Sequence, residues 1–270
     1  MAKARKTKPR AKPRARKPKK LVASARMKAA AVKSAKKAAK GASIRRARAG
    51  KPAAKKSAKA KPAGLVLYGV HRSIPSCKVG LMLAMLGVPF AYRHMDLAAG
   101  AHRTPEFQAK NRFMQVPVLQ DGETVVCQSN VILGYLADKY GKFGGRTPAE
   151  RLRVAEWLAW DLDRMAQGLG LTRAFTQFLK QDPAVVTFTR GRGEQALDLL
   201  DRHLGTSKFL AGPAPTIADI AIFAWVATAE EGGFDIARWP NVQAWALRML
   251  AQPGAAHPYA IMPREDRAAP

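Results

Sequence analysis

The first 63 residues contain neither an acidic nor an aromatic residue. They hold 25 of the 47 Lys and Arg residues, so they carry most of the formal charge of +28, and residues 64–270 are close to neutral. A segment with so little apolar surface to bury cannot offset its chain entropy, and we expect residues 1–63 to be disordered. The chain is therefore predicted to join a polybasic tail to a globular body.

Cysteine is also scarce, since Cys77 and Cys127 are the only two and lie far apart. This excludes a disulfide framework and the paired spacing of a zinc site. The five histidines are scattered without ligand spacing, so we predict no metal. The longest apolar run of the body, "IAIFAWVATA", is too short to span a bilayer, and no transmembrane helix is predicted. The expected location is the cytoplasm, with association with the nucleoid through the tail as a further option.

The tail indicates binding to a polyanion. Lysine and arginine on a flexible chain release counterions from DNA or RNA, and such affinity falls steeply with salt. Because no aromatic side chain is available for base stacking, sequence specificity is not expected. The composition resembles the Lys-, Ala- and Pro-rich tails of linker histones and histone-like bacterial proteins. Two alternatives stay open: a targeting presequence, which is also Arg-rich and poor in acids, and a tail that only solubilises.

From Gly64 to Gly141 the pattern predicts the order β-α-β-α-β-β-α. Parallel strands are implied by the first β-α-β unit, and Asp121-Gly122 is a strong hairpin signal. The predicted strands are the runs 65–70 and 90–97 and the two arms of the hairpin 116–128. The predicted helices cover 75–87, 104–111 with Thr104 as N-cap, and 129–141.

After the linker "KFGGRTP" the strand signal is lost, and every remaining stretch predicts a helix. These stretches are 149–165, 184–205, 216–233 and 241–250. Thr216 and Asp219 in "PTIAD" form a structural capping box. The expected fold class is thus α/β plus all-α, with a tail over 1–63, an α/β domain over 64–141 and an all-helical domain over 148–262.

Four motifs in register carry a family resemblance. They are the turn "HRSIPSCKV", "QVPVL" before the hairpin, "QSNVILGYL" at the third helix and "PTIADI" in the helical part. The body resembles the cytosolic glutathione transferase superfamily, in particular its serine-type, theta-like bacterial members, over about residues 65–260. The resemblance implies a thioredoxin-like first domain, glutathione as co-substrate and a homodimer.

The resemblance assigns catalysis to Ser73, in the turn after the first strand. The reactive form of glutathione is the thiolate, so the protein must lower a thiol pKa that is otherwise near 8.5. A hydroxyl at the positive end of a helix does this by donating a hydrogen bond to sulfur. The alternative is a helix-cap serine. Ser76 is the second choice, and Cys77 is expected to be packing.

The resemblance also implies the glutathione-binding residues. Pro117 matches a proline that the family holds in the cis form, Val116 would pair its backbone with the cysteinyl part, and Gln115 would contact glutathione with its side chain. Gln128 and Ser129 match the pair that holds the γ-glutamyl end, where a helix N-terminus suits a carboxylate. The alternatives are an ordinary edge strand with trans proline, and Ser129 as a simple N-cap.

The expected function is therefore conjugation of glutathione to an electrophilic small molecule. A non-catalytic glutathione-binding or dimerisation module, tethered to DNA or RNA by the tail, is the alternative, because fold does not fix function. Disulfide exchange is disfavoured by the absence of cysteine at positions 73 and 76. The electrophile cannot be assigned from these motifs.

Overall fold

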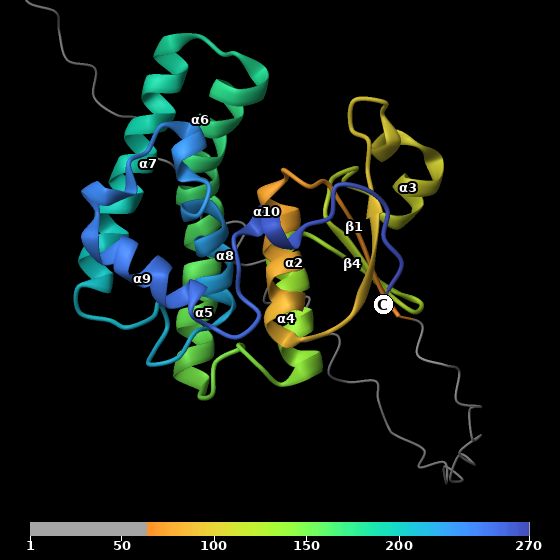
Figure 1. Ribbon diagram of the computed structural model, residues 1–270, viewed down its shortest axis with the longest axis horizontal. Helices are drawn as coiled ribbons and strands as arrows, with labels where there is room; N and C mark the ends of the chain where they lie inside the picture. The colour runs from red at the N-terminus through yellow and green to blue at the C-terminus, as the bar shows by residue number, and fades with distance from the viewer. Residues whose placement is uncertain (1–63, 270) are drawn as a thin grey trace, which may run out of the picture. The chain divides into compact units, whose positions relative to one another are not determined.

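A four-stranded sheet forms the first domain of the structure, a computed structural model that describes residues 64–269 (Figure 1). The predicted tail lies outside the described residues. The strand order is β2-β1-β3-β4, with β1 and β2 parallel and the other neighbours antiparallel. The strands are β1 (Leu65–Gly69), β2 (Phe90–His94), β3 (Val118–Asp121) and β4 (Thr124–Cys127). This is the predicted order, including the hairpin at Gly122.

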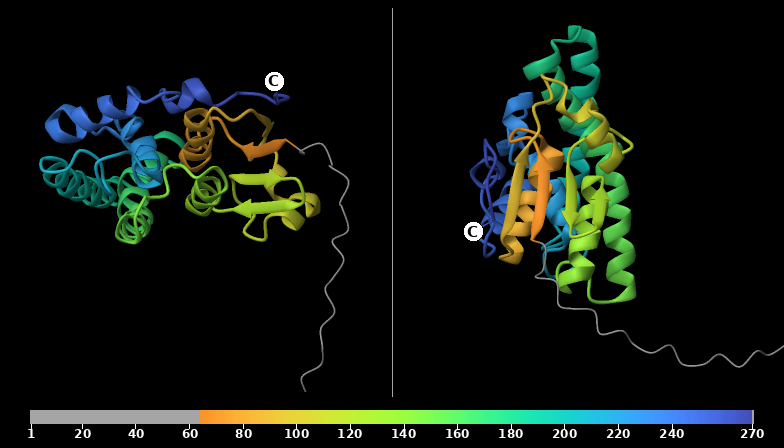
Figure 2. Two further views of the ribbon diagram at one scale, coloured as in Figure 1. Left: turned by 90° about the horizontal axis from the view of Figure 1, so that it is seen from below. Right: turned by 90° about the vertical axis from the view of Figure 1, so that its right-hand side faces the viewer.

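Helices cover both faces of this sheet, because its strands alternate in burial. Leu65 and Leu67 of β1 belong to the main core with α2 (Ile74–Leu86) and α4 (Ser129–Tyr140). Tyr68 joins a smaller cluster with Phe107 of α3 (Pro105–Lys110), on the other face. The left view of Figure 2 shows the strands between these two layers.

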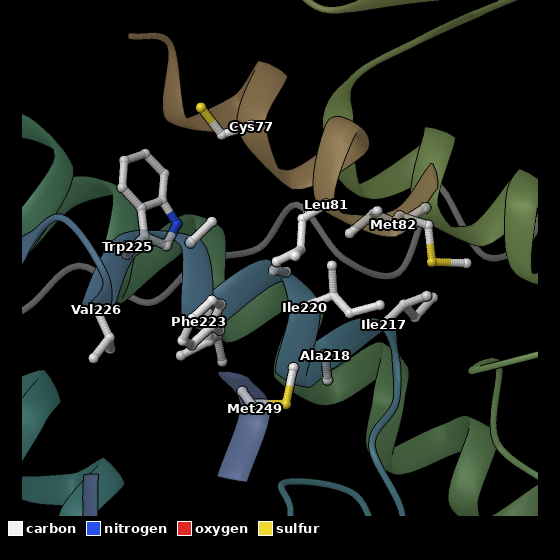
Figure 3. Close-up of a cluster of buried hydrophobic side chains, with 14 of the residues drawn as sticks. Cys77, Leu81, Met82, Ile217, Ala218, Ile220, Phe223, Trp225, Val226 and Met249 are labelled. Atoms are coloured by element: carbon white, nitrogen blue, oxygen red, sulfur yellow. The ribbon is translucent and has the colours of Figure 1, made fainter. Parts of the chain in front are cut away.

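The helical domain is built around α8 (Ile217–Val226), whose ten residues are all buried. In Figure 3, Leu81 and Met82 of α2 lie against Ile217 and Ile220 of α8, so one continuous core joins the domains. The other helices of this domain are α5 (Pro148–Trp160), α6 (Leu171–Ala174), α7 (Pro183–Leu204), α9 (Pro240–Leu250) and α10 (Pro258–Ile261). The predicted fold class, a thioredoxin-like domain followed by helices, is confirmed for the described residues.

One long helical segment differs from its predicted extent. It starts at α5 and continues through π-helical η3 (Asp161–Gly170), α6 and π-helical η4 (Phe175–Leu179), well beyond the predicted end at residue 165. The glycines that weaken the helix signal have a packing role: a Cβ on Gly168 would lie 2.6 Å from Cα of Gly193 in α7. Glycine is therefore present at this contact because two helices pack closely there, and it does not mark a loop.

Helix starts agree with prediction in two places and differ in one. Thr104 caps α3 by accepting a hydrogen bond from the Phe107 N–H at 3.3 Å. Asp219 binds the N–H and hydroxyl of Thr216 at 2.9 and 3.0 Å in the predicted capping box. Ser129 is not the N-cap of α4, because Gln128 occupies that position and Ser129 is the first helical residue.

Candidate active site

Six of the residues predicted for the site line one cavity of about 450 Å³. The helical domain completes its wall with Leu162, Ala166 and Trp225. The six are Ser73, Gln115, Val116, Pro117, Gln128 and Ser129. They come from three separate segments of the chain, so the fold brings together motifs that are distant in the sequence.

Ser73 ends the turn after β1 and is the N-cap of α2. Its backbone is extended and its N–H donates to the carbonyl of Val70 at 3.0 Å, while its side chain makes no capping bond to the helix. The N-terminus of a 13-residue helix carries a partial positive charge. A hydroxyl in this position can donate to an anion in the cavity.

Ser76 and Cys77, the neighbouring candidates, do not line the cavity. Ser76 is fully buried, and its Oγ accepts the Val70 N–H at 3.4 Å. The Cys77 thiol is fully buried as well and donates to the carbonyl of His71 at 3.3 Å. Burial raises the pKa of this thiol to about 12. Both residues hold the turn from inside, and the thiol stays protonated at neutral pH.

Arg173 of α6 holds the same turn from the other domain. Its Nη2 donates to the carbonyl of Arg72 at 3.2 Å and to the Tyr259 hydroxyl at 2.6 Å. Its Nε and the Arg72 guanidinium both bind the carboxylate of Glu231 at 2.7 Å. The backbone just before Ser73 is thereby fixed by a buried guanidinium, which sequence reasoning missed because its partners are distant in the chain.

The peptide bond between Val116 and Pro117 is cis, in agreement with the resemblance. The loop before it is fixed by buried Asn111, whose Nδ2 donates to the carbonyl of Gln115 at 2.6 Å. The side chains of Gln115 and Gln128 meet at 3.3 Å along the rim of the cavity. The amides are thus placed side by side where a polar ligand can reach them.

The N-terminus of α4 also opens into the cavity. Gln128 has φ 68° and ψ 118°, a conformation that residues with a Cβ adopt rarely and that occurs at ligand sites. Ser129 follows it and is buried, with its side chain in the cavity wall. Free N–H groups at the start of a helix bind carboxylates well.

A buried ion pair reaches into the wall of the same cavity. Lys78 of α2 and Asp161 of η3 are both fully buried, with 2.5 Å between Nζ and Oδ2. Asn130 of α4 and the indole N–H of Trp225 donate to the same carboxylate at 2.9 and 2.8 Å. Burial lowers the pKa of the Lys78 ammonium, and Asp161 opposes that shift. The network ties the start of α4 to the helical domain.

Sequence reasoning missed further residues of the cavity wall, among them Lys78, His102 and Asn111. Lys78 had a visible signal, since it is a lone charge in the apolar helix "CKVGLMLAML". His102 has a buried Nδ1 without a hydrogen-bond partner among the described residues. Nothing in the local sequence marks Asn111.

Comparison with known proteins agrees with this architecture. Residues 63–138 match the family model "Glutathione S-transferase, N-terminal domain", and residues 183–248 match "Glutathione S-transferase, C-terminal domain". Glutathione S-transferase 2 of Anopheles gambiae is 32% identical over 200 residues, which cover 71% of this chain and 93% of the relative.

Solved structures give the same result. A glutathione S-transferase from Xanthobacter autotrophicus Py2 is 33% identical, covers 72% of this chain and 96% of its own, and superposes with a TM-score of 0.67. A family member from Pseudomonas fluorescens Pf-5, solved with two glutathione molecules bound, is 25% identical over 75% of this chain and 95% of its own, with a TM-score of 0.68. With both domains matched and a relative above 30% identity covered almost completely, this chain belongs to the glutathione S-transferase family.

Proposed function

We propose that the protein conjugates the thiolate of glutathione to an electrophilic small molecule, with Ser73 as the catalytic residue. The observation that carries the proposal is the position of Ser73, which stands at the N-terminus of α2 with its hydroxyl uncommitted to the helix and lines the cavity. A hydroxyl donating to sulfur there favours the ionised thiol. This corresponds to the serine-type, theta-like class of the family.

The rest of the cavity supports binding of glutathione. Backbone groups of Val116 beside cis-Pro117 are suited to pair with the cysteinyl part as an added strand would. The N-terminus of α4, with Gln128 and Ser129, is suited to the γ-glutamyl carboxylate. The side chain of Gln115, which lines the cavity, is suited to a further polar contact with the peptide.

Substitution of Ser73 tests the catalytic proposal. We expect Ser73→Ala to lower kcat with 1-chloro-2,4-dinitrobenzene by on the order of 10²-fold. This is the usual effect of removing one hydrogen-bond donor to an anion in an active site. Glutathione affinity, measured by calorimetry, should change little. The pH at which kcat/KM is half-maximal should move upward, because the bound thiol loses the hydrogen bond that favours its ionised form.

A distant serine supplies the matched control. Ser207 follows α7 and does not line the cavity, so Ser207→Ala removes the same hydroxyl elsewhere and should retain full turnover. Unchanged turnover in Ser73→Ala would remove Ser73 from the mechanism. Glutathione binding without turnover in the unmodified protein would instead favour a non-catalytic binding module.

The tail supports a second, separate proposal, binding of nucleic acid through residues 1–63. Its composition favours this, because 25 cations without acids create strong attraction to phosphates. Binding to a DNA duplex should weaken steeply between low and physiological salt, and a chain starting at Gly64 should lose it. Retention of binding in the shortened chain would contradict the proposal.

We also propose that the protein is a homodimer, and that its two domains cover residues 64–141 and 148–262.

No helix within residues 64–269 is long and apolar enough to cross a membrane.

A further inference from the structure

The backbone carbonyls of residues 70–73, in the turn that carries Ser73, are all bound by hydrogen-bond donors. Three of them accept from the Ser73 N–H and from the N–H and the thiol of Cys77, at distances between 2.9 and 3.3 Å. The carbonyl of Arg72 accepts instead from Arg173 of α6, at 3.2 Å. The peptide group that leads into Ser73 is therefore held by the helical domain, whereas the rest of the turn holds itself.

The Arg173 guanidinium has a fixed orientation. Its side chain is 8% exposed, and the nitrogen that binds Arg72 also donates to the Tyr259 hydroxyl at 2.6 Å. Its Nε binds the carboxylate of Glu231 at 2.7 Å, and the Arg72 guanidinium binds the same carboxylate at 2.7 Å. A planar guanidinium with several partners cannot rotate without losing some of them. Arg72 is thus held both through its carbonyl and through its side chain.

The elements that carry Arg173 and Glu231 are themselves anchored. In α6, the buried Thr172 hydroxyl donates to the carbonyl of Gly168 at 2.7 Å. Glu231 lies in η5 (Ala229–Gly232), where its backbone carbonyl accepts from the side chain of Gln177 at 2.8 Å. The guanidinium is therefore placed against the turn by supported backbone on both sides.

We propose that Arg173 is a positioning residue for ionisation of the glutathione thiol, acting through the Arg72 carbonyl on the orientation of the Ser73 hydroxyl. The inference rests on the proposed catalytic role of Ser73. Because the Ser73 side chain makes no capping bond, its placement depends on the adjoining backbone. A hydroxyl stabilises a thiolate only at hydrogen-bonding distance and angle. Arg173 does not line the cavity, so its effect passes through Ser73.

The ionisation of bound glutathione tests this without an electrophile. The ultraviolet absorbance of the thiolate is followed against pH in the full chain, with the S-methylglutathione complex as the baseline. We expect the pH of half-ionisation to move upward in Arg173→Gln, as in Ser73→Ala and by a smaller amount. The reason is that the Ser73 hydroxyl is still present but is no longer held in place.

The pH profile of turnover separates positioning from loss of folded protein. With 1-chloro-2,4-dinitrobenzene, we expect Arg173→Gln to lose about tenfold in kcat/KM at mildly acidic pH, the effect of about one hydrogen bond. The loss should shrink at alkaline pH, where the thiol is ionised in both proteins. A loss of equal size at every pH would overturn the inference, because a smaller folded fraction produces that result.

Two further variants separate the position of the guanidinium from its charge. Glu231→Ala keeps the charge of Arg173 and removes the carboxylate that orients it, so the pH of half-ionisation should move upward. A charge acting directly on the thiolate predicts a downward move, because a negative group is removed, and that outcome would contradict positioning. Tyr259→Phe removes a single bond to the guanidinium and should give a smaller upward move.

Arg153→Gln is the matched control. The Arg153 Nε also donates to a backbone carbonyl, that of Ala211 at 2.8 Å, and neither residue lines the cavity. This variant should keep both the ionisation and the turnover of the unmodified protein. The other titratable groups beside the turn and the cavity are the same in all variants, namely His71, Cys77, Lys78, His102 and Asp161.

The outcomes distinguish this inference from the proposed function. An upward move in Ser73→Ala without one in Arg173→Gln overturns the inference alone. No move in Ser73→Ala contradicts the role of Ser73, and the inference fails with it. An ionised bound thiol without turnover contradicts conjugation, and the move in Arg173→Gln then still decides whether Arg173 positions Ser73.

Discussion

At the scale of single residues, three side chains in the turn from Val70 to Cys77 have different surroundings. Ser73 lines a cavity, whereas Ser76 and Cys77 face the core and bond to the backbone of the turn. A thiolate in that core would lose its hydration without gaining a cation within bonding distance. Cys77 is therefore a structural residue.

This predicts different reactivities for the two cysteines. At pH 8 we expect Cys77 to resist alkylation by iodoacetamide in the folded protein, because a pKa of about 12 leaves almost no thiolate. Cys127 is only partly buried, and burial raises its pKa less strongly, so it should react first. Mass spectrometry of labelled peptides measures both, and guanidinium chloride should make them equal. Faster labelling of Cys77 in the folded state would show that the turn opens.

The site residues that could be predicted are those that belong to short sequence motifs. Ser73, Pro117 and the pair Gln128–Ser129 lie in short motifs, and all line the cavity. Arg173 and Asn111 act through backbone carbonyls, and nothing in the sequence shows which carbonyl they reach. The alternative role of Ser129 as a simple N-cap is wrong, because α4 starts at Ser129 itself and Gln128 is its N-cap.

At the scale of secondary structure, the helix through residues 148–179 extends well beyond its predicted end at residue 165. In the structure, Gly168 and Gly193 let the backbones of η3 and α7 approach each other. Helix propensity disfavours glycine by about 1 kcal/mol, and tertiary contact overrides that preference. The strands and the short helix α3 were predicted well, since their alternation and caps are local.

Alanine at two glycines of this helix pair should have opposite effects. Gly168→Ala places a methyl group against the Gly193 backbone, so it should lower the free energy of unfolding by about 1–3 kcal/mol. Gly191→Ala in α7 meets no atom within 4 Å and should stabilise by up to about 1 kcal/mol. Denaturant titration of the two variants measures both. A neutral Gly168→Ala would show that the helices separate without cost.

At the scale of the whole described body, the two domains share one core and one buried charge pair. Helix α8 contributes its full length to the core, and Lys78 meets Asp161 across the domain boundary. Removing one partner of such a pair lowers the free energy of unfolding strongly, because the remaining charge stays buried without its partner. The domains should therefore unfold together.

A double-mutant cycle measures this link. We expect Lys78→Met and Asp161→Leu each to lower the free energy of unfolding by about 3–5 kcal/mol, and the double variant to lose less than the sum of the two. Because Asp161 also accepts from Asn130 and Trp225, its substitution should be the more harmful. Additive losses, or separate unfolding transitions in sheet and helix signals, would contradict a shared unit.

The pairing of Tyr92 in β2 with Arg267 has a consequence for biosynthesis. The sheet is made early in translation, yet its β2 edge acquires this partner only when residue 267 has left the ribosome. The contact of His71 with the Met262 carbonyl, at 2.8 Å, closes equally late. Contacts between distant parts of a chain form slowly. The turn that carries Ser73 should thus mature only after residue 262 has left the ribosome, so a chain that has exposed the first domain alone would be inactive.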